Sequence, residues 1–257
     1  MSGYAVLVRK ELREAWRTRR LPVLAVLFLV VGIVSPLTAR YLNEILRLAL
    51  ADQLPMTLPD PTVAESAGQL LKNLGQLGAL AAIALAMGAV SGELDRGTAA
   101  LVLAQPATRP AFLAAKLTAI AATLAICTAL AVASAWIYTI ILFEPVPVGA
   151  WIVLAILTWL SLVAWAAITF LASAATGSTM AAAGLGFVAL IGLSVLAVIP
   201  ALDRVLPTGL AAPSLHLAAN DGVPVDAGAL ALTITGSVVL ILLCAGGAVA
   251  AFRRREL

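Results

Sequence analysis

Five stretches of the sequence contain no Asp, Glu, Lys or Arg, and they limit what the chain can fold into. They are Leu21–Ala39, Asn73–Gly92, Leu117–Phe143, Pro145–Leu202 and Ala227–Phe252. An apolar helix needs about 20 residues to cross a hydrocarbon core of about 30 Å. As one helix the fourth stretch would be about 85 Å long, so it must fold back, and Thr176-Gly177-Ser178-Thr179 is the natural turn. The pattern predicts an all-α polytopic membrane protein with six transmembrane helices.

The composition of the chain excludes a soluble globular protein. Hydrophobic residues make up 62% of the sequence and charged residues only 11%, whereas soluble domains contain about 25% charged residues. We therefore expect an interfacial helix over residues 1–20 and a six-span transmembrane domain over residues 21–257. Within that domain a loop at 91–116 and longer segments at 40–68 and 201–226 connect the spans.

Lys and Arg gather on one side of the predicted bundle. They are frequent before the first span, in the loop at 91–116 and at the C-terminus, whereas acidic residues dominate the segments at 40–68 and 201–226. Loops on the cytoplasmic side carry the excess of Lys and Arg in membrane proteins. The pattern predicts a multi-pass protein of the cytoplasmic (inner) membrane with both termini and the loop at 91–116 cytoplasmic. The same distribution of Lys and Arg explains the net charge of +3, so we expect no nucleic-acid partner.

The segment before the first span has the pattern of an amphipathic helix. Its apolar face consists of Tyr4, Val8, Leu12, Ala15 and Trp16, and its charged face of Arg9, Lys10, Arg13 and Arg17. A helix with two such faces lies in the membrane interface. The segment is longer than the basic region of a signal peptide and no small-residue cleavage site follows, so we expect it to be retained.

Residues suited to catalysis or metal binding are sparse. His216 is the single histidine, and Cys127 and Cys244 both lie in predicted spans, so a zinc site built from His and Cys is excluded. The sequence has no Gly-rich loop ending in Gly-Lys-Ser or Gly-Lys-Thr to hold ATP phosphates. We expect no enzyme activity, no catalytic residue, no metal and no cofactor bound by this chain. The spans also lack the buried charges on which proton-driven pumps depend, so a partner would supply the energy for transport.

One loop, between the second and third spans, concentrates the polar chemistry of the chain. Its sequence, SGELDRGTAALVLAQPATRPAFLAAK, gathers charges, a Gly-Thr pair and a Pro-x-x-Arg turn at Glu93, Asp95, Arg96, Gly97, Thr98, Pro106, Arg109 and Lys116. Thr98 can cap a short helix that starts near Ala99, and Pro106 ends that helix. We expect Arg109 and Lys116 to face a soluble partner or lipid phosphates.

These features resemble the permease subunits of ABC type-2 transporters, whose loop between the second and third spans has this order of residues. The segment Arg9-Lys10-Glu11-Leu12-Arg13-Glu14 is similar to the elbow helix of the same family. The resemblance implies that the loop carries a coupling helix, which docks into a groove of a cytoplasmic ABC ATPase subunit. It further implies two ATPase copies that bind ATP and Mg, and a second permease, which we expect to be an identical chain. Without such a partner the loop would be a solvated segment held by lipid headgroups.

A second group of polar side chains lies at the outer end of the second span. Gln69, Lys72, Asn73 and Gln76 are spaced by three or four residues, so they share one face of a helix. Gln69, Asn73 and Gln76 could line a substrate cavity that opens outward. Alternatively, the helix starts outside the membrane and its first turns are simply hydrated.

The function that these observations favour is that of a permease in an ATP-driven ABC exporter. A scaffold that links a cytoplasmic ATPase to an outer-side protein is the alternative, and it includes permeases that help mature copper enzymes. In that case the segments at 40–68 and 201–226 would form the docking surface. A stand-alone channel, which would have no ATPase partner, is the third hypothesis. Substrate identity does not follow from the sequence.

Overall fold

The computed structural model describes residues 3–50, 60–95 and 108–254, and every regular element in these ranges is a helix. Six helical segments are long and apolar enough to cross a membrane, which confirms the predicted all-α polytopic fold. These segments are Arg20–Leu42, Val63–Glu93, Arg109–Leu142, Val148–Thr176, Thr179–Leu196 and Ala227–Arg253.

Shorter helices precede, interrupt and connect the spans. In chain order the described elements are α1 (Gly3–Arg17), α2 (Arg20–Leu50), α3 (Val63–Asn73), η1 (Leu74–Gly78), α4 (Ala79–Met87), α5 (Ser91–Asp95), α7 (Arg109–Leu142), α8 (Val148–Thr176), α9 (Thr179–Leu196), α10 (Pro200–Asp203), η2 (Pro207–Leu210), α11 (Ala211–Ala219) and α12 (Ala227–Arg253). The second span consists of α3, η1 and α4, because η1 is one turn of π-helix inserted into an otherwise α-helical segment. Such insertions widen a helix locally and are frequent at functional sites.

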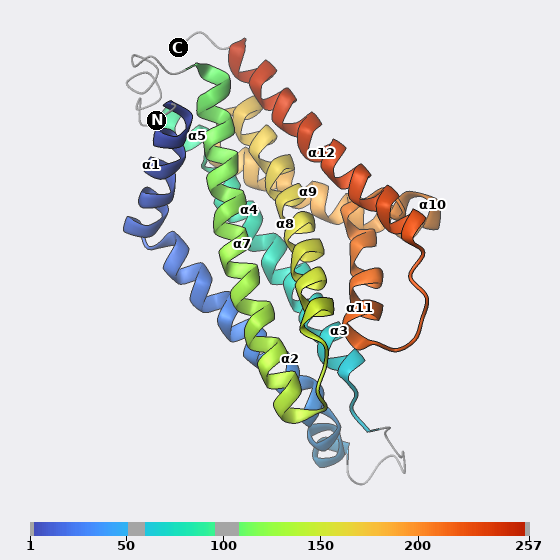
Figure 1. Ribbon diagram of the computed structural model, residues 1–257. Helices are drawn as coiled ribbons and strands as arrows, with labels where there is room; N and C mark the ends of the chain where they lie inside the picture. Colours follow the sequence, from blue (N-terminus) through green and yellow to red (C-terminus); the bar gives the residue numbers. More distant parts are fainter. Residues whose placement is uncertain (1–2, 51–59, 96–107, 255–257) are drawn as a thin grey trace.

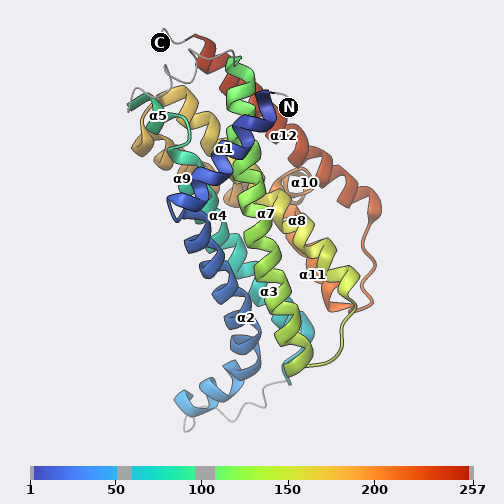
Figure 2. The ribbon, with the colours of Figure 1, turned by 60° about the vertical axis from the view of Figure 1, so that its left-hand side comes forward.

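Helices α7 and α8 pack against each other at the centre of the bundle (Figure 1). Helices α1 and α2 pack against α7, α12 packs against α8, and α4 packs against both α8 and α9. In both views α1, α5, the start of α7 and the end of α12 lie at the same end of the bundle (Figure 2). The segments rich in Lys and Arg therefore meet at one end of the molecule.

The third span starts earlier than the charge pattern predicts. Helix α7 begins at Arg109 rather than at Leu117. The hydroxyl of Thr108 accepts a hydrogen bond from the backbone N–H of Ala111 (3.4 Å), and Pro110 occupies the first turn. A hydroxyl cap and a first-turn proline both favour helix initiation whatever the hydropathy of the following residues. The first two turns of α7 therefore belong to the predicted loop, and they carry Lys116 near their end.

The turn predicted within the longest charge-free stretch is present. Gly177 ends α8 with a positive φ of 68°, a conformation that glycine adopts without steric cost. Ser178 then caps α9, since its side chain accepts a hydrogen bond from the backbone N–H of Ala181 (3.4 Å). This short connection makes α8 and α9 antiparallel neighbours.

The predicted outer connections contain more helix than the sequence suggests. Helix α2 continues to Leu50, and α3 starts at Val63 with a capping box between Thr62 and Glu65. Residues 51–59 lie outside the described residues. In the segment at 201–226, α10 and η2 lead into α11, which packs back against α8 and α3. This segment is therefore partly re-entrant, as protein contacts on both sides allow.

A hydrogen bond closes the connection between α11 and α12. His216 Nδ1 lies 2.8 Å from Asp221 Oδ2, and the backbone N–H of Val223 donates to the other carboxylate oxygen (3.0 Å). The hydrogen bond to His216, followed by that from Val223, holds the pKa of Asp221 below its usual value. The single histidine of the chain thus has a structural role in this loop.

Two spans approach each other closely where Gly32 of α2 faces α7. A Cβ atom at Gly32 would overlap the Ser134 hydroxyl and the carbonyl oxygen of Ala131. The hydroxyl of Ser134 donates to the carbonyl oxygens of Leu130 (2.8 Å) and Ala131 (3.0 Å), so it has little room to move. Small residues allow transmembrane helices to approach so closely.

We predict that Gly32→Ala lowers the thermal stability of the protein in detergent. Replacing glycine by alanine in a helix is usually stabilising by about 1 kcal/mol, but here the added methyl group overpacks the contact, at a typical cost of about 1–3 kcal/mol. Gly246→Ala on α12 is the matched control, because a Cβ there meets no atom within 4 Å. Thermal unfolding followed by size-exclusion chromatography would measure both variants. Equal stability of the two would contradict the close packing at Gly32.

Candidate functional site

Two of the predicted coupling residues can be placed in the structure. Glu93 lies on α5, and Arg109 is the first residue of α7, where its Nη1 donates to the carbonyl oxygen of Arg253 at the end of α12 (3.4 Å). The remainder of the predicted set lies outside the described residues: the side chain of Asp95, and Arg96, Gly97, Thr98 and Pro106. The described residues therefore include both flanks of the predicted coupling segment at 96–107.

Lys116 is the centre of an ionic cluster at this end of the bundle. Its side chain is only 5% exposed, and its Nζ lies 2.6 Å from Glu93 Oε1 and 3.0 Å from Glu11 Oε2. The three residues come from α7, α5 and α1. We call Lys10, Glu11, Glu93 and Lys116 the Lys116 cluster. The expectation that Lys116 faces a soluble partner or lipid is wrong, because the ammonium group is enclosed by carboxylates of its own chain.

Lys10 adds a second positive charge at the more exposed edge of the cluster. Its Nζ lies 3.2 Å from Glu11 Oε1, 3.7 Å from Glu93 Oε1 and 3.9 Å from Glu14 Oε2. Burial acts to lower the pKa of Lys10, but the charges of Glu11, Glu93 and Glu14 outweigh it and leave this pKa raised. Two ammonium groups therefore face three carboxylates.

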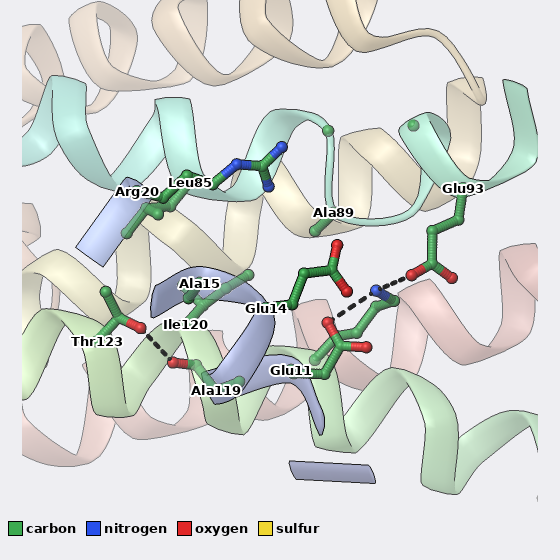
Figure 3. Close-up of a pocket in the computed structure, with 13 residues that line it drawn as sticks. Glu11, Glu14, Ala15, Arg20, Leu85, Ala89, Glu93, Ala119, Ile120 and Thr123 are labelled. Carbon is green, nitrogen blue, oxygen red and sulfur yellow. Dashed lines mark hydrogen bonds and ion pairs between the residues drawn. The ribbon is translucent and has the colours of Figure 1, made fainter. Parts of the chain in front are cut away.

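The three carboxylates surround a small pocket (Figure 3). Glu11, Glu14 and Glu93 point toward one another, and an oxygen of each lies within 4.8 Å of the others, close enough to hold a divalent cation. The pocket measures about 70 Å³. However, the Nζ of Lys116 already sits between Glu11 and Glu93 and supplies the positive charge that a cation would bring. We therefore assign an internal ion-pair network here and no metal site.

The Lys116 side chain also connects to the end of α12. Its Nζ lies 5.1 Å from the centre of the Phe112 ring, within the range of a cation–π interaction. The Phe112 ring in turn packs against Phe252 of α12, with 6.2 Å between ring centres. Phe112 and Phe252 are both almost completely buried. The Lys116 cluster is thus continuous with the aromatic packing that joins α7 to α12.

A hydroxyl network holds the position of α5, and hence of Glu93. Helix α4 ends at Met87, and the Ser173 hydroxyl of α8 donates to the Met87 carbonyl (2.8 Å) while accepting from the backbone N–H of Ser91 (3.1 Å). The Ser91 hydroxyl also lies 2.9 Å from the hydroxyl of Thr179 at the start of α9. The break between α4 and α5 is therefore fixed to α8 and α9 by side-chain hydrogen bonds.

Sequence reasoning did not identify Glu11 as a site residue. Glu11 lies on the charged face of an amphipathic helix, where a surface position is the usual reading. The sequence pattern that indicates a buried Lys116 lies in α7. Lys116 shares a helical face with three apolar residues that are buried in the structure: Phe112, Leu113 and Ile120. Since a buried lysine usually requires a carboxylate partner, that spacing predicts that Lys116 has one, although it does not identify Glu11.

The polar group at the outer end of the second span faces α2 in part. Asn73 Nδ2 donates to the hydroxyl of Ser35 on α2 (2.9 Å), and Gln69 Nε2 donates to Asn73 Oδ1 (3.5 Å). Gln76 lies in η1 and is exposed. These contacts connect α3 to α2, and a substrate-lining role for the three residues stays a prediction.

Comparison with known proteins gives the chain a family. A family model described as ABC-2 family transporter protein matches residues 5–210, well over half of the 257 residues. A curated Bacillus subtilis (strain 168) protein, named as the uncharacterized transmembrane protein YxlG, is 29% identical over 118 residues. That alignment covers 45% of this chain and 46% of the relative, so the chain matches about half the length of YxlG. The matched region runs from α1 through the first five spans and, together with the six-span helical fold, it shows that the chain is a multi-pass membrane protein of the ABC-2 transporter family.

Proposed function

We propose that the chain is the transmembrane permease subunit of an ATP-driven ABC exporter. A separate cytoplasmic ATPase subunit would bind ATP and Mg, and this chain would move the substrate across the cytoplasmic membrane. Two points support the proposal: the ABC-2 family, whose permeases typically work with ATPase subunits, and the lack of a phosphate-binding loop in the sequence. The excess of Lys and Arg at the end of the bundle that contains α1 and α5 supports a cytoplasmic position for that end and for both termini.

The observation that carries the proposal is the pair of short contacts between Lys116, Glu11 and Glu93. Residues 96–107 connect α5 to α7 and would contact the ATPase. Glu93 lies just before this segment and Lys116 follows it, so both of its flanks belong to the Lys116 cluster. When ATP binding moves the segment, the ion pairs would transmit the displacement to α7, which spans the membrane, and to the elbow helix α1. Charged contacts in a poorly hydrated environment are strong enough to keep these helices together.

We propose further that two copies of the chain pair in the membrane and engage two ATPase copies. Helix α9 has an apolar surface that the rest of the described chain leaves largely uncovered, with Met180 and Val188 largely exposed. Gly184 and Gly192 lie two turns apart on α9, and the space beside each is open for at least 4 Å. Glycines so placed let a second helix approach closely. Pairing through α9 would bring the two permeases together without displacing any contact within one chain.

We predict that Lys116→Met lowers ATP hydrolysis that depends on this permease by at least tenfold in nanodiscs containing both subunits. Removing one partner of a buried ion pair typically costs about 3–5 kcal/mol, because the other charge stays buried. Lys116→Arg keeps the charge and should retain most of the activity. Lys72→Met, which removes an exposed lysine of α3, is the matched control and should behave as the unmodified protein.

A neutral triple variant separates coupling from folding. Glu11→Gln, Glu93→Gln and Lys116→Met together remove every charge of the central contacts, and neutral replacement of a buried ionic group is often compatible with full stability. We expect this variant to reach the membrane and bind the ATPase, yet to lack stimulated ATP hydrolysis. If its ATPase activity equals that of the unmodified complex, the Lys116 cluster does not transmit the motion.

We predict that Arg96→Ala reduces the amount of ATPase that co-purifies with the permease at least fivefold. Arginine is a frequent energetic hot spot, and its loss at an interface typically costs about 2 kcal/mol. Arg254→Ala, at the exposed end of α12, is the control with the same loss of charge. The measurement is affinity purification from native membranes in a mild detergent, with quantitative mass spectrometry of the retained proteins.

The same purification tests the proposed function as a whole. A soluble partner with a Gly-Lys-Ser or Gly-Lys-Thr phosphate loop, present in equal amount to the permease, supports the exporter. Recovery of the chain alone would favour a channel, and recovery with outer-side proteins only would favour a scaffold. In either of these cases the assignment of residues 96–107 as a coupling segment is wrong.

A further inference from the structure

A second cavity, distinct from the pocket at the Lys116 cluster, lies within the bundle of a single chain. It measures about 220 Å³, is open on one side, and is lined by η1 and the end of α3, the middle of α8, the second half of α9, η2 and the start of α11. It shares no lining residue with the pocket at the Lys116 cluster. Four parts of the chain that are distant in sequence thus converge on one space.

The lining of this cavity is apolar with several hydroxyl groups. Leucines and Trp165 form most of the wall, and none of the described residues around it carries an ionisable side chain. A charged ligand would therefore be buried without a counter-charge, which is strongly unfavourable. The cavity suits an uncharged ligand.

One hydroxyl in the wall lacks the partner that a buried polar group requires. Thr158 of α8 is 8% exposed, and its Oγ1 has no hydrogen-bond partner within the described part of the chain. Buried hydroxyl groups are nearly always hydrogen-bonded, and each exception needs an explanation. Ser161 and Trp165 follow Thr158 at offsets of three and seven, so all three line the cavity from one face of α8.

Three other hydroxyls of the wall, those of Ser194, Thr208 and Ser214, already donate hydrogen bonds within the chain. Ser194 donates to the carbonyl oxygen of Leu190 (2.7 Å), Ser214 donates to the carbonyl of Leu210, and Thr208 donates to Asp203 Oδ1 (2.9 Å). Each of these oxygens can still accept a hydrogen bond from a ligand. These three hydroxyls can therefore only accept a hydrogen bond from a ligand. The hydroxyl of Thr158 is not engaged in any hydrogen bond with the described residues.

The π-helical turn η1 creates part of the space. Gly75 lies in η1 and lines the cavity, and a Cβ atom there would meet no other atom within 4 Å. The space beside residue 75 is therefore open, and we expect a larger side chain at this lining position to occupy part of the cavity.

We propose that this cavity binds a small uncharged amphiphile whose N–H or O–H group forms a hydrogen bond with the Thr158 hydroxyl. An apolar cavity of about 150 Å³ holds benzene, so by proportion a cavity of about 220 Å³ holds a ligand of about nine non-hydrogen atoms. The site lies within one permease chain and needs neither the ATPase nor a second copy.

The test uses the purified full chain in nanodiscs, without any ATPase, and indole as the probe. Indole has an apolar ring system of the required size and one N–H donor, whereas indene has the same shape and no donor. Saturable binding of radiolabelled indole is measured by scintillation proximity, with empty nanodiscs to subtract partition into lipid. We expect saturable binding, and competition by indene at least fivefold weaker than by unlabelled indole.

Two variants and one control decide the location of the site. Gly75→Leu is designed to fill the cavity and should abolish saturable binding of indole. Thr158→Val preserves the volume of the side chain but removes the hydroxyl, so it should weaken indole binding at least fivefold. Gly246→Leu, at an equally open glycine of α12, should bind indole as the unmodified chain does.

Three results would overturn the proposal: no saturable binding of indole, equal competition by indene and indole, or unchanged binding in the Thr158→Val protein. The second of these would mean that the space is a void filled by any apolar molecule, including a lipid acyl chain. If Gly75→Leu fails to fold, the isosteric Thr158→Val still decides the question. Because the nanodiscs contain this chain alone, the outcome is independent of whether the permease couples to an ATPase.

Discussion

The arrangement of helices at one end of the molecule depends on a buried ammonium group. The side chain of Lys116 is only 5% exposed, and two carboxylates at 2.6 and 3.0 Å from its ammonium group offset the cost of removing its charge from water. Glu11 and Glu93 therefore have to be supplied by α1 and α5. This requirement fixes the elbow helix against α7 and determines where the chain leaves the second span, so one interaction positions three helices.

Hydropathy predicts the fold of this chain well and predicts its site poorly. The six spans follow from charge-free stretches, since the membrane imposes the same requirement on every segment that crosses it. The start of α7 was placed eight residues too late, at Leu117 instead of Arg109, because a Thr108 cap and a first-turn proline decide helix initiation. The partner of Lys116 was missed for another reason: Glu11 is 105 positions away, and only the packing of α1 on α7 brings the two together.

The uncharged cavity illustrates what local patterns cannot reveal. Its walls come from residues between Leu71 and Ser214, and they include a π-helical turn with the open position of Gly75. Hydroxyl residues in a transmembrane helix usually donate to the carbonyl one turn earlier, as Thr169 does. In the sequence Thr158 is indistinguishable from such a residue, and only the structure shows that its hydroxyl is unengaged.

Helices α8 and α9 both line the cavity and both contact the break between α4 and α5. Thr158 faces the cavity, and Ser173, about 22 Å further along the same helix at about 1.5 Å per residue, holds the break between α4 and α5 that positions Glu93. The Lys116 cluster is ionic and the cavity is uncharged for a physical reason. Ion pairs have a tolerable free-energy cost near the end of the bundle, whereas deeper in the membrane a neutral hydroxyl has a lower free-energy cost than a charge. A ligand that shifts α8 would therefore act on the hydroxyl network around Ser173, and through it on the position of α5.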